Sequence, residues 1–287
     1  MPQKISPLAL AMAKFHNIDL SKIQGTGIQN RIMSTDIFNS NNNVNVGNVS
    51  STSIQEKIID VTTIRNAIAK AMIVSKNEIP TTVLTFFVDV TKLVNYRKQV
   101  KEQVQSTYNL KLSYLPFFVK AVIYAIQKYP IFNSSYIKET NKIHIKGSIN
   151  FGIAVDTENG LMVPNIKDAD KLSIVQIGQK IIELANKARN KQLSLAEIKN
   201  GTISLTNFGS INAAWGTPII NYPEVAIVAP GNIEERLSRN ESNQIIAKQI
   251  MPFTIAADHR WIDGADIGRF MKVIAHHLET LEGLEVK

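Results

Sequence analysis

The sequence predicts an α/β (α+β) two-layer body that follows a small all-α module. From about residue 62 onward, amphipathic helical segments alternate with short strands rich in β-branched residues. This alternation favours helices packed on one side of a sheet. Residues 39–53, NSNNNVNVGNVSSTS, contain no charge, no aromatic side chain and no periodicity, which is typical of a flexible linker. We therefore expect a module at residues 3–38, a linker at 39–54 and the body at 55–287.

The module is expected to begin with a helix. Ser6 is suited to be its N-cap and Pro7 its first helical residue. Apolar side chains then follow at helical spacing: Leu8, Ala11, Met12 and Phe15. A short second helix is expected to start at Ser34 or Thr35. A module of about 38 residues is near the lower limit for independent folding, so each apolar residue in it matters.

The first half of the body is predicted to contain a helix, a strand and two further helices. Thr62 or Thr63 caps the first helix, and residues 83–90 form a strand of β-branched and aromatic side chains. Thr91 is expected to cap a polar amphipathic helix that reaches about Tyr108. Residues 115–129 are apolar nearly all round, so we expect a buried helix there.

The second half is predicted to be richer in strands. Residues 150–156 and 161–166 are expected to pair as a hairpin, because Thr157-Glu158-Asn159-Gly160 between them has Asn-Gly at the turn. The remaining elements are an amphipathic helix at 173–189, a helix opened by the capping box Ser194–Glu197, strands at 202–206, 225–229 and 253–257, and a last helix at 265–281.

Composition excludes several classes of function. The chain has no cysteine, which removes disulfides, thiolate metal sites and a cysteine nucleophile. No apolar run of about 18 residues and no secretory signal are present, so we expect a cytoplasmic protein without a membrane span. The net charge of +8 fits an anionic ligand or partner. Since the lysines are scattered, we do not expect nucleic-acid binding.

The segment TIAADHRWIDG, residues 254–264, is the strongest candidate for chemistry. It places His259 at the end of an apolar strand and Asp263 just before the last helix. A histidine there can titrate near neutral pH and move protons. The residue types alone leave a second interpretation open, in which Asp263 is only the helix N-cap and His259 a satisfied interior histidine. The other histidines, His16, His144, His276 and His277, are expected at the surface.

The six residues from His259 to Gly264 match the HRxxDG signature of dihydrolipoamide acyltransferases, the core components of 2-oxo-acid dehydrogenase complexes. Chloramphenicol acetyltransferase shares the wider HxxxD pattern. Further segments resemble the same family in order and spacing: RNAIAKAM (65–72), DVTKL (89–93), YLPF (114–117), VDTENGLMVP (155–164), DADK (168–171) and TPIINYPEVA (217–226). The resemblance covers nearly the whole chain and is greatest to bacterial pyruvate-type members, which makes acetyl the leading acyl group.

This resemblance implies a chloramphenicol-acetyltransferase-like fold, assembled as homotrimers that build 24- or 60-subunit cages with active sites between subunits. It implies that His259 takes a proton from a thiol and that Asp263 fixes the local structure, with Arg65 a candidate partner. Thr206, in the segment SLTNFG, aligns with the family residue whose hydroxyl donates to the oxyanion. Residue type alone would make Thr206 a strand residue. Coenzyme A is the implied substrate, lipoamide is supplied in trans, and no metal is implied.

Residues 5–37 resemble the peripheral subunit-binding domain of these proteins. This domain docks dihydrolipoamide dehydrogenase or the decarboxylating component through basic side chains, and Arg31 and Lys14 occupy basic positions. Leu10 stands where the pattern usually has an arginine, so the resemblance implies weaker docking or docking of one partner only. The alternative is a small structural domain whose cations are merely solvated.

Two further departures from the family concern lipoylation and one loop. No lipoyl domain fits before Ser6, so acyl groups are expected on a separate lipoylated protein, unless a lipoyl domain has been removed. Residues 139–143, ETNKI, mimic a lipoyl attachment tip, but we expect Lys142 to belong to an ordinary hairpin turn. Asn212 and Ala213 replace paired glycines, which puts acyl-chain selectivity in doubt.

Two other functions remain open at this point. One is a non-catalytic scaffold that keeps the fold and docks partners. The other is an acetyltransferase for a small hydroxyl compound. The presence of His259, Asp263 and Thr206 argues against the scaffold, and the subunit-binding module argues against the hydroxyl acetyltransferase.

Overall fold

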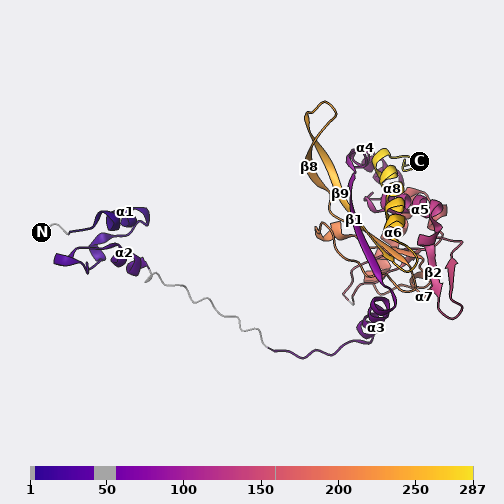
Figure 1. Cartoon of the computed structure of the whole chain (residues 1–287), viewed down its shortest axis with the longest axis horizontal. Helices are drawn as coiled ribbons and strands as arrows, with labels where there is room; N and C mark the ends of the chain where they lie inside the picture. Colours follow the sequence, from indigo (N-terminus) through magenta and orange to yellow (C-terminus); the bar gives the residue numbers. More distant parts are fainter. Residues whose placement is uncertain (1–3, 42–55, 159, 287) are drawn as a thin grey trace. The chain divides into compact units, whose positions relative to one another are not determined.

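The structure is a computed structural model that describes residues 4–41, 56–158 and 160–286. The chain divides into two compact units, residues 1–60 and 61–287, each described here by itself (Figure 1). The predicted linker at 39–54 falls mostly outside the described residues. In the described part of the chain, no helix combines the length and apolar character that a membrane span requires.

The first unit is a small helical module. Its helices are α1 (Pro7–Phe15) and α2 (Ser34–Asn41), with 3₁₀ turns at Leu20–Lys22 and Ile28–Asn30. As predicted, the Ser6 side chain caps α1, accepting a hydrogen bond from the Ala9 amide. The predicted helix is confirmed, and of its apolar residues at helical spacing Met12 packs against the core whereas Leu8 and Phe15 are exposed. The buried core is instead made of small and β-branched residues: Ala9, Ala13, Ile23, Ile32 and Ile37.

The body is built from helices and strands in the following order: α3 (Thr63–Glu78), β1 (Thr81–Asp89), α4 (Thr91–Tyr108), α5 (Leu115–Lys128), β2 (Ser134–Ile137), β3 (Lys142–Ile145), β4 (Phe151–Ile153), β5 (Asn165–Ile166), α6 (Ile174–Arg189), α7 (Leu195–Ile198), β6 (Ile203–Leu205), β7 (Ala226–Pro230), β8 (Glu234–Arg239), β9 (Ile245–Asp258) and α8 (Gly264–Thr280).

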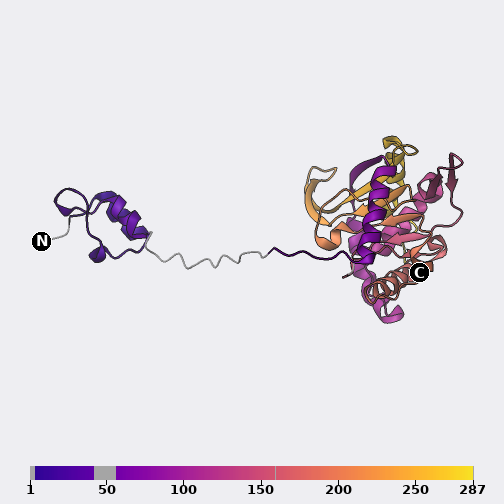
Figure 2. The ribbon, with the colours of Figure 1, turned by 90° about the horizontal axis from the view of Figure 1, so that it is seen from below.

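The main sheet has the strand order β1-β9-β7-β6-β4-β5, and β8 pairs with the outer half of β9. β4, β6 and β7 run parallel to one another, whereas β1 and β7 are antiparallel to β9. One face of the sheet is covered by helices: α8 packs on α5 and β1, and α5 packs on α6 (Figures 1 and 2). The predicted two-layer α/β body is confirmed.

Local signals located most of these elements correctly. Thr62 caps α3, Ser173 and Ser194 open capping boxes, and α5 is buried along most of its length. The predicted hairpin at 150–166 is confirmed by the β4–β5 pairing, with Asn159 outside the described residues.

Two expectations about the body were wrong. Thr91 is not the cap of α4 but its first residue; the N-cap is Val90, and the Thr91 amide donates to the Asp89 carboxylate. The ribbon formed by β8 and the outer part of β9 was not predicted. The β8 side chains are mostly polar, and the outer part of β9 reads IIAKQI, so neither strand has the apolar alternation on which a strand prediction depends.

Candidate functional site

His259 directly follows the last residue of β9. Its amide donates to the Pro80 carbonyl at 2.8 Å, just beyond the Thr81–Asp258 pair that ends the ladder between β1 and β9. The amides of Trp261 and Ile262 both donate to the Asp258 carbonyl, which closes a tight turn. His259 is exposed on this turn, so the alternative of a satisfied interior histidine is wrong. An exposed imidazole at a rigid strand end is available for proton transfer.

The turn is fastened by an ion pair that the sequence analysis missed. Asp258 is 1% exposed, and Arg260 donates two hydrogen bonds to its carboxylate, from Nη2 at 2.7 Å and from Nε at 3.0 Å. This hydrogen-bonded carboxylate raises the pKa of Arg260. The sequence signal was an aspartate and an arginine two residues apart at the end of an apolar strand. These residues flank the histidine in the motif.

Asp263 is the N-cap of α8, as the structural interpretation expected. Its side chain accepts from the Asp266 amide at 2.8 Å, and the Asp266 side chain accepts from the Asp263 amide, completing a capping box. The backbone hydrogen bond from Asp266 is the main cause that lowers the pKa of Asp263. The cap therefore fixes how the chain passes from the His259 turn into α8.

The expected pairing of Arg65 with Asp263 is not among the ion pairs of the described residues. Arg65 lies in the first turn of α3, where its guanidinium is next to Gly160. The cation nearest Asp263 is instead Arg269, on the same helix, which binds Asp266. Within one chain, the Arg65 guanidinium therefore lies beside the hairpin at Gly160.

Thr206 lies just past β6, half-buried, and its amide donates to the Val228 carbonyl at 3.0 Å. The register from β6 through β7 to β9 puts Thr206 level with Thr254. His259 is five residues further along β9, which at ~3.3 Å per residue is about 16 Å along the strands. One chain therefore does not bring the Thr206 hydroxyl to the His259 ring.

A cavity of about 690 Å³ opens between α3, the Leu161–Val163 segment and the loop before β7. Glu224 lines it while being only 2% exposed. Its Oε1 accepts from Ser204 at 2.9 Å and from Asn221 at 3.0 Å, and burial raises its pKa to about 7. Sequence reasoning missed this carboxyl, whose only signal was a glutamate directly before a buried strand.

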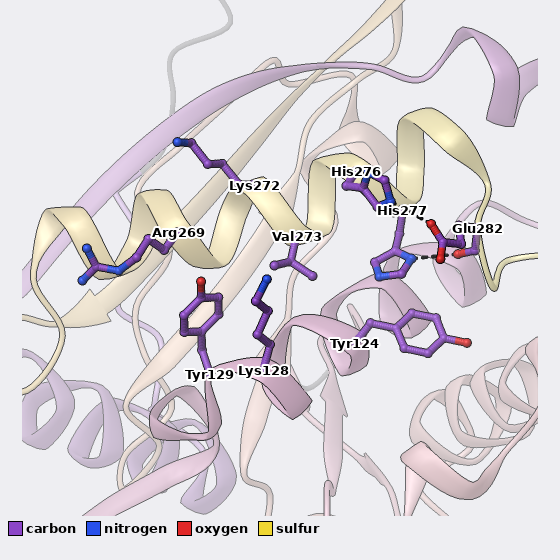
Figure 3. A pocket seen from close by; sticks show the side chains of 9 residues that line it. All are labelled: Tyr124, Lys128, Tyr129, Arg269, Lys272, Val273, His276, His277 and Glu282. Carbon is purple, nitrogen blue, oxygen red and sulfur yellow. Dashed lines mark hydrogen bonds and ion pairs between the residues drawn. The ribbon is translucent and has the colours of Figure 1, made fainter.

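A second cleft, of about 550 Å³, lies between α5 and α8 (Figure 3). His277 stacks on Tyr124 with ring centroids 4.5 Å apart, and the Glu282 carboxylate binds His276 at 2.8 Å. These histidines lie near the end of α8, about 20 Å from Asp263 at ~1.5 Å per residue. The histidine end of the cleft is therefore remote from the motif turn, whereas its other end is lined by Arg269, which binds Asp266.

In the small module, Arg31 and Lys14 are both exposed, as docking residues would have to be. Lys14 lies in the last turn of α1, and Arg31 follows the Ile28–Asn30 turn, where its carbonyl accepts from the Gly27 amide at 2.9 Å. Leu10 is 37% exposed on α1. The histidines His16 and His144 are at the surface, as expected.

Comparison with known proteins gives two family matches. Residues 54–286 match the family described as "2-oxoacid dehydrogenases acyltransferase (catalytic domain)", and residues 3–38 match the "e3 binding domain". A Mycoplasma genitalium protein named the dihydrolipoyllysine-residue acetyltransferase component of pyruvate dehydrogenase complex is 55% identical over 232 residues. That alignment covers 81% of this chain and 60% of the relative, so the chain spans well under two thirds of that protein's length.

Two solved structures are similar to the body. A probable dihydrolipoamide acetyltransferase from Listeria monocytogenes is 37% identical with a TM-score of 0.75, covering 79% of this chain and 95% of that one. The dihydrolipoamide acetyltransferase of Azotobacter vinelandii, solved to study the roles of a serine, a histidine and an asparagine in catalysis, is 29% identical with a TM-score of 0.77. The alignment covers 80% of this chain and 95% of that one. This chain belongs to the 2-oxoacid dehydrogenase acyltransferase family, and its N-terminal module belongs to the e3 binding domains.

Proposed function

We propose that the protein transfers an acyl group, most simply acetyl, between dihydrolipoamide and coenzyme A as the core of a pyruvate-type 2-oxo-acid dehydrogenase complex. The observation that supports this best is the exposed His259 on its rigid turn, within an HRxxDG motif in a chain of this family. The names of the relatives support acetyl transfer involving dihydrolipoamide, and coenzyme A is the second thiol that the family resemblance implies.

His259 would act as the general base. A free thiol is only a few per cent ionised at neutral pH, whereas the thiolate is the nucleophile. His259 takes the thiol proton as sulfur adds to the acyl carbonyl, which is worth roughly 10²–10⁴ in rate. The Thr206 hydroxyl donates to the resulting oxyanion, and the departing thiol recovers the proton from His259. Because the chain has no cysteine, an acyl-cysteine intermediate cannot form, which favours direct transfer between the two substrates.

We further propose that each active site is formed by two chains. The separation of about 16 Å along the strands between Thr206 and His259 prevents one chain from supplying both groups. A homotrimer that juxtaposes Thr206 of one subunit with His259 of the next removes this difficulty. A related solved structure is titled the cubic core of the pyruvate dehydrogenase multienzyme complex, which supports assembly of such trimers into a cage.

The N-terminal module is proposed to dock dihydrolipoamide dehydrogenase. The match to the e3 binding domain and the exposed Arg31 and Lys14 support this role. The acyl group would arrive on a lipoyl arm, and the complex would operate in the cytoplasm. Docking of the decarboxylating component is the alternative partner for the same module.

The assay that tests the reaction mixes the purified full chain, acetyl-CoA and dihydrolipoamide and follows acetyl-dihydrolipoamide. We expect turnover by the parent and a loss of at least 100-fold in kcat for His259→Ala. A parent that does not turn over but still binds dihydrolipoamide dehydrogenase would indicate the scaffold. Acetylation of a small hydroxyl acceptor in place of dihydrolipoamide would indicate the other alternative.

A further inference from the structure

The Arg260 guanidinium is held on two sides. On one side it binds the carboxylate of Asp258. On the other side it lies over two aromatic rings, 5.2 Å from the centroid of Tyr136 and 5.4 Å from that of Trp261. The two rings contact each other with centroids 4.8 Å apart. These contacts with Asp258, Tyr136 and Trp261 form the slot of Arg260, and the side chain remains 29% exposed within it.

This slot determines the shape of the His259 turn. Asp258 and Arg260 are two residues apart, and both the amide and the side chain of Arg260 donate to the Asp258 carboxylate. Those bonds draw the backbone into a loop whose apex is the one residue between them, His259. The Asp258 carboxylate is buried, so it requires the cation and cannot easily release it.

The hairpin of β2 and β3 supplies one wall of the slot. These strands form their own two-stranded sheet, apart from the main one, so they add nothing to the main ladder. Tyr136 on β2 packs against Trp261, and Lys138 just beyond it pairs with Glu78 at 3.3 Å. Glu78 ends α3, two residues before Pro80, whose carbonyl holds the His259 amide. The hairpin therefore contacts both the turn after His259, through Trp261, and the end of α3 before Pro80, through Glu78.

We propose that Arg260 and Tyr136 are positioning residues that set the direction of the His259 imidazole. The effect on catalysis rests on the proposed acyltransferase function, whereas the effect on the imidazole does not. Neither residue needs to touch substrate. A base displaced by about 1 Å can lose on the order of 100-fold in rate, so a brace of this kind has a measurable consequence.

Three variants of the full chain separate positioning from folding. Tyr136→Leu removes the ring against the guanidinium, and Tyr136→Phe keeps it, losing only the hydrogen bond to Asn141. Arg260→Lys keeps a cation for the buried Asp258 but loses the planar fork. Arg260→Ala is avoided because it would leave that carboxylate without its cation.

We expect Tyr136→Leu and Arg260→Lys to lower kcat at least tenfold with KM within about twofold of the parent, and Tyr136→Phe to match the parent. The pH profile of kcat should shift in the first two variants only. Independently of activity, the rate at which diethyl pyrocarbonate modifies His259, followed by peptide mass spectrometry across pH, should change in the same two variants.

The two measurements keep the hypotheses apart. If the parent does not transfer acetyl groups, the proposed function fails, while the modification rates still decide the positioning role. Folded Tyr136→Leu and Arg260→Lys proteins with parental modification rates and pH profiles would overturn the inference. A loss in Tyr136→Phe equal to that in Tyr136→Leu would overturn the role of the ring.

Discussion

Three buried carboxyl groups show how individual residues are accommodated in this fold. Asp36 accepts hydrogen bonds from the Thr26 hydroxyl and from the amides of Met33 and Thr26, which lower its pKa. Asp258 has the Arg260 guanidinium. Glu224 accepts from the neutral side chains of Ser204 and Asn221, and burial raises its pKa to about 7. Glu224 therefore changes protonation near neutral pH.

Glu224 should make the stability of the body depend on pH. Its folded pKa of about 7 lies above the ordinary value of 4.5, so the unfolded chain loses this proton first as pH rises. The contribution of the neutral carboxyl to the free energy of unfolding is complete below about pH 4.5 and is lost as pH rises through about 7. The free energy of unfolding should change by about 3 kcal/mol across this range. Glu224→Gln should remove this component of the slope in urea unfolding between pH 5 and pH 8.

The matched control for this experiment is Glu241→Gln, at an exposed position in the turn after β8. It should retain the parental dependence of the unfolding free energy on pH. The assignment to Glu224 fails if Glu224→Gln unfolds with the same pH dependence as the parent.

At the scale of elements, helices and strands were predicted correctly when the signals for them lay within one short segment of the sequence. α8 was predicted almost to the residue because its cap at Asp263 and its apolar spacing lie within one segment. The buried face of α1 was not predicted, because packing on α2 buries the small residues Ala9 and Ala13, and the apolar spacing alone did not indicate this. The β8–β9 ribbon pairs the mostly polar β8 with the segment IIAKQI of β9, and neither sequence alternates apolar and polar residues, so the ribbon could not be predicted from an apolar pattern.

The cap of α8 is the element whose loss should matter most for the site. Asp263→Ala removes the acceptor for the Asp266 amide, whereas Asp263→Asn keeps it. We expect the alanine variant to melt about 3 °C lower and the asparagine variant to melt within about 1 °C of the parent, by calorimetry. The alanine variant should also lose kcat, since the cap holds the chain that leaves the His259 turn. Equal melting of the two variants would show that the cap does not stabilise the helix.

At the scale of the whole molecule, the site residues were predicted individually but not their arrangement. His259, Asp263 and Thr206 were identified from motif and resemblance. Their separation was not, because it depends on the order β9-β7-β6 and on strand direction. Within one chain α3 carries Arg65 toward Gly160, so its pairing with Asp263 stays a prediction. The separation of Thr206 from His259 and the place of Arg65 both depend on contacts between segments far apart in the sequence, and no local pattern encodes such contacts.

Docking by the N-terminal module should be electrostatic. We expect Arg31→Ala to weaken capture of dihydrolipoamide dehydrogenase by the full chain about tenfold at 20 mM salt and less at 500 mM, because salt screens exposed charges. Surface plasmon resonance with the immobilised dehydrogenase measures the affinity at both salt concentrations. Lys22→Ala, at an exposed lysine paired with Asp19, is the control and should bind as the parent does. Equal affinity of Arg31→Ala and the parent at low salt would rule Arg31 out.

Mixed trimers test the two-chain site directly. His259→Ala lacks the base and Thr206→Val lacks the hydroxyl, so each variant alone should be impaired in acetyl transfer. If a site takes Thr206 from one subunit and His259 from the next, random co-assembly should restore parental geometry at about one quarter of the sites. Co-expressed chains should therefore regain about 25% of parental kcat, whereas the same two proteins mixed after separate assembly should not. If Thr206 and His259 of one chain acted together, no co-assembled site would hold both groups. Co-expression would then give no more activity than the mean of the two variants.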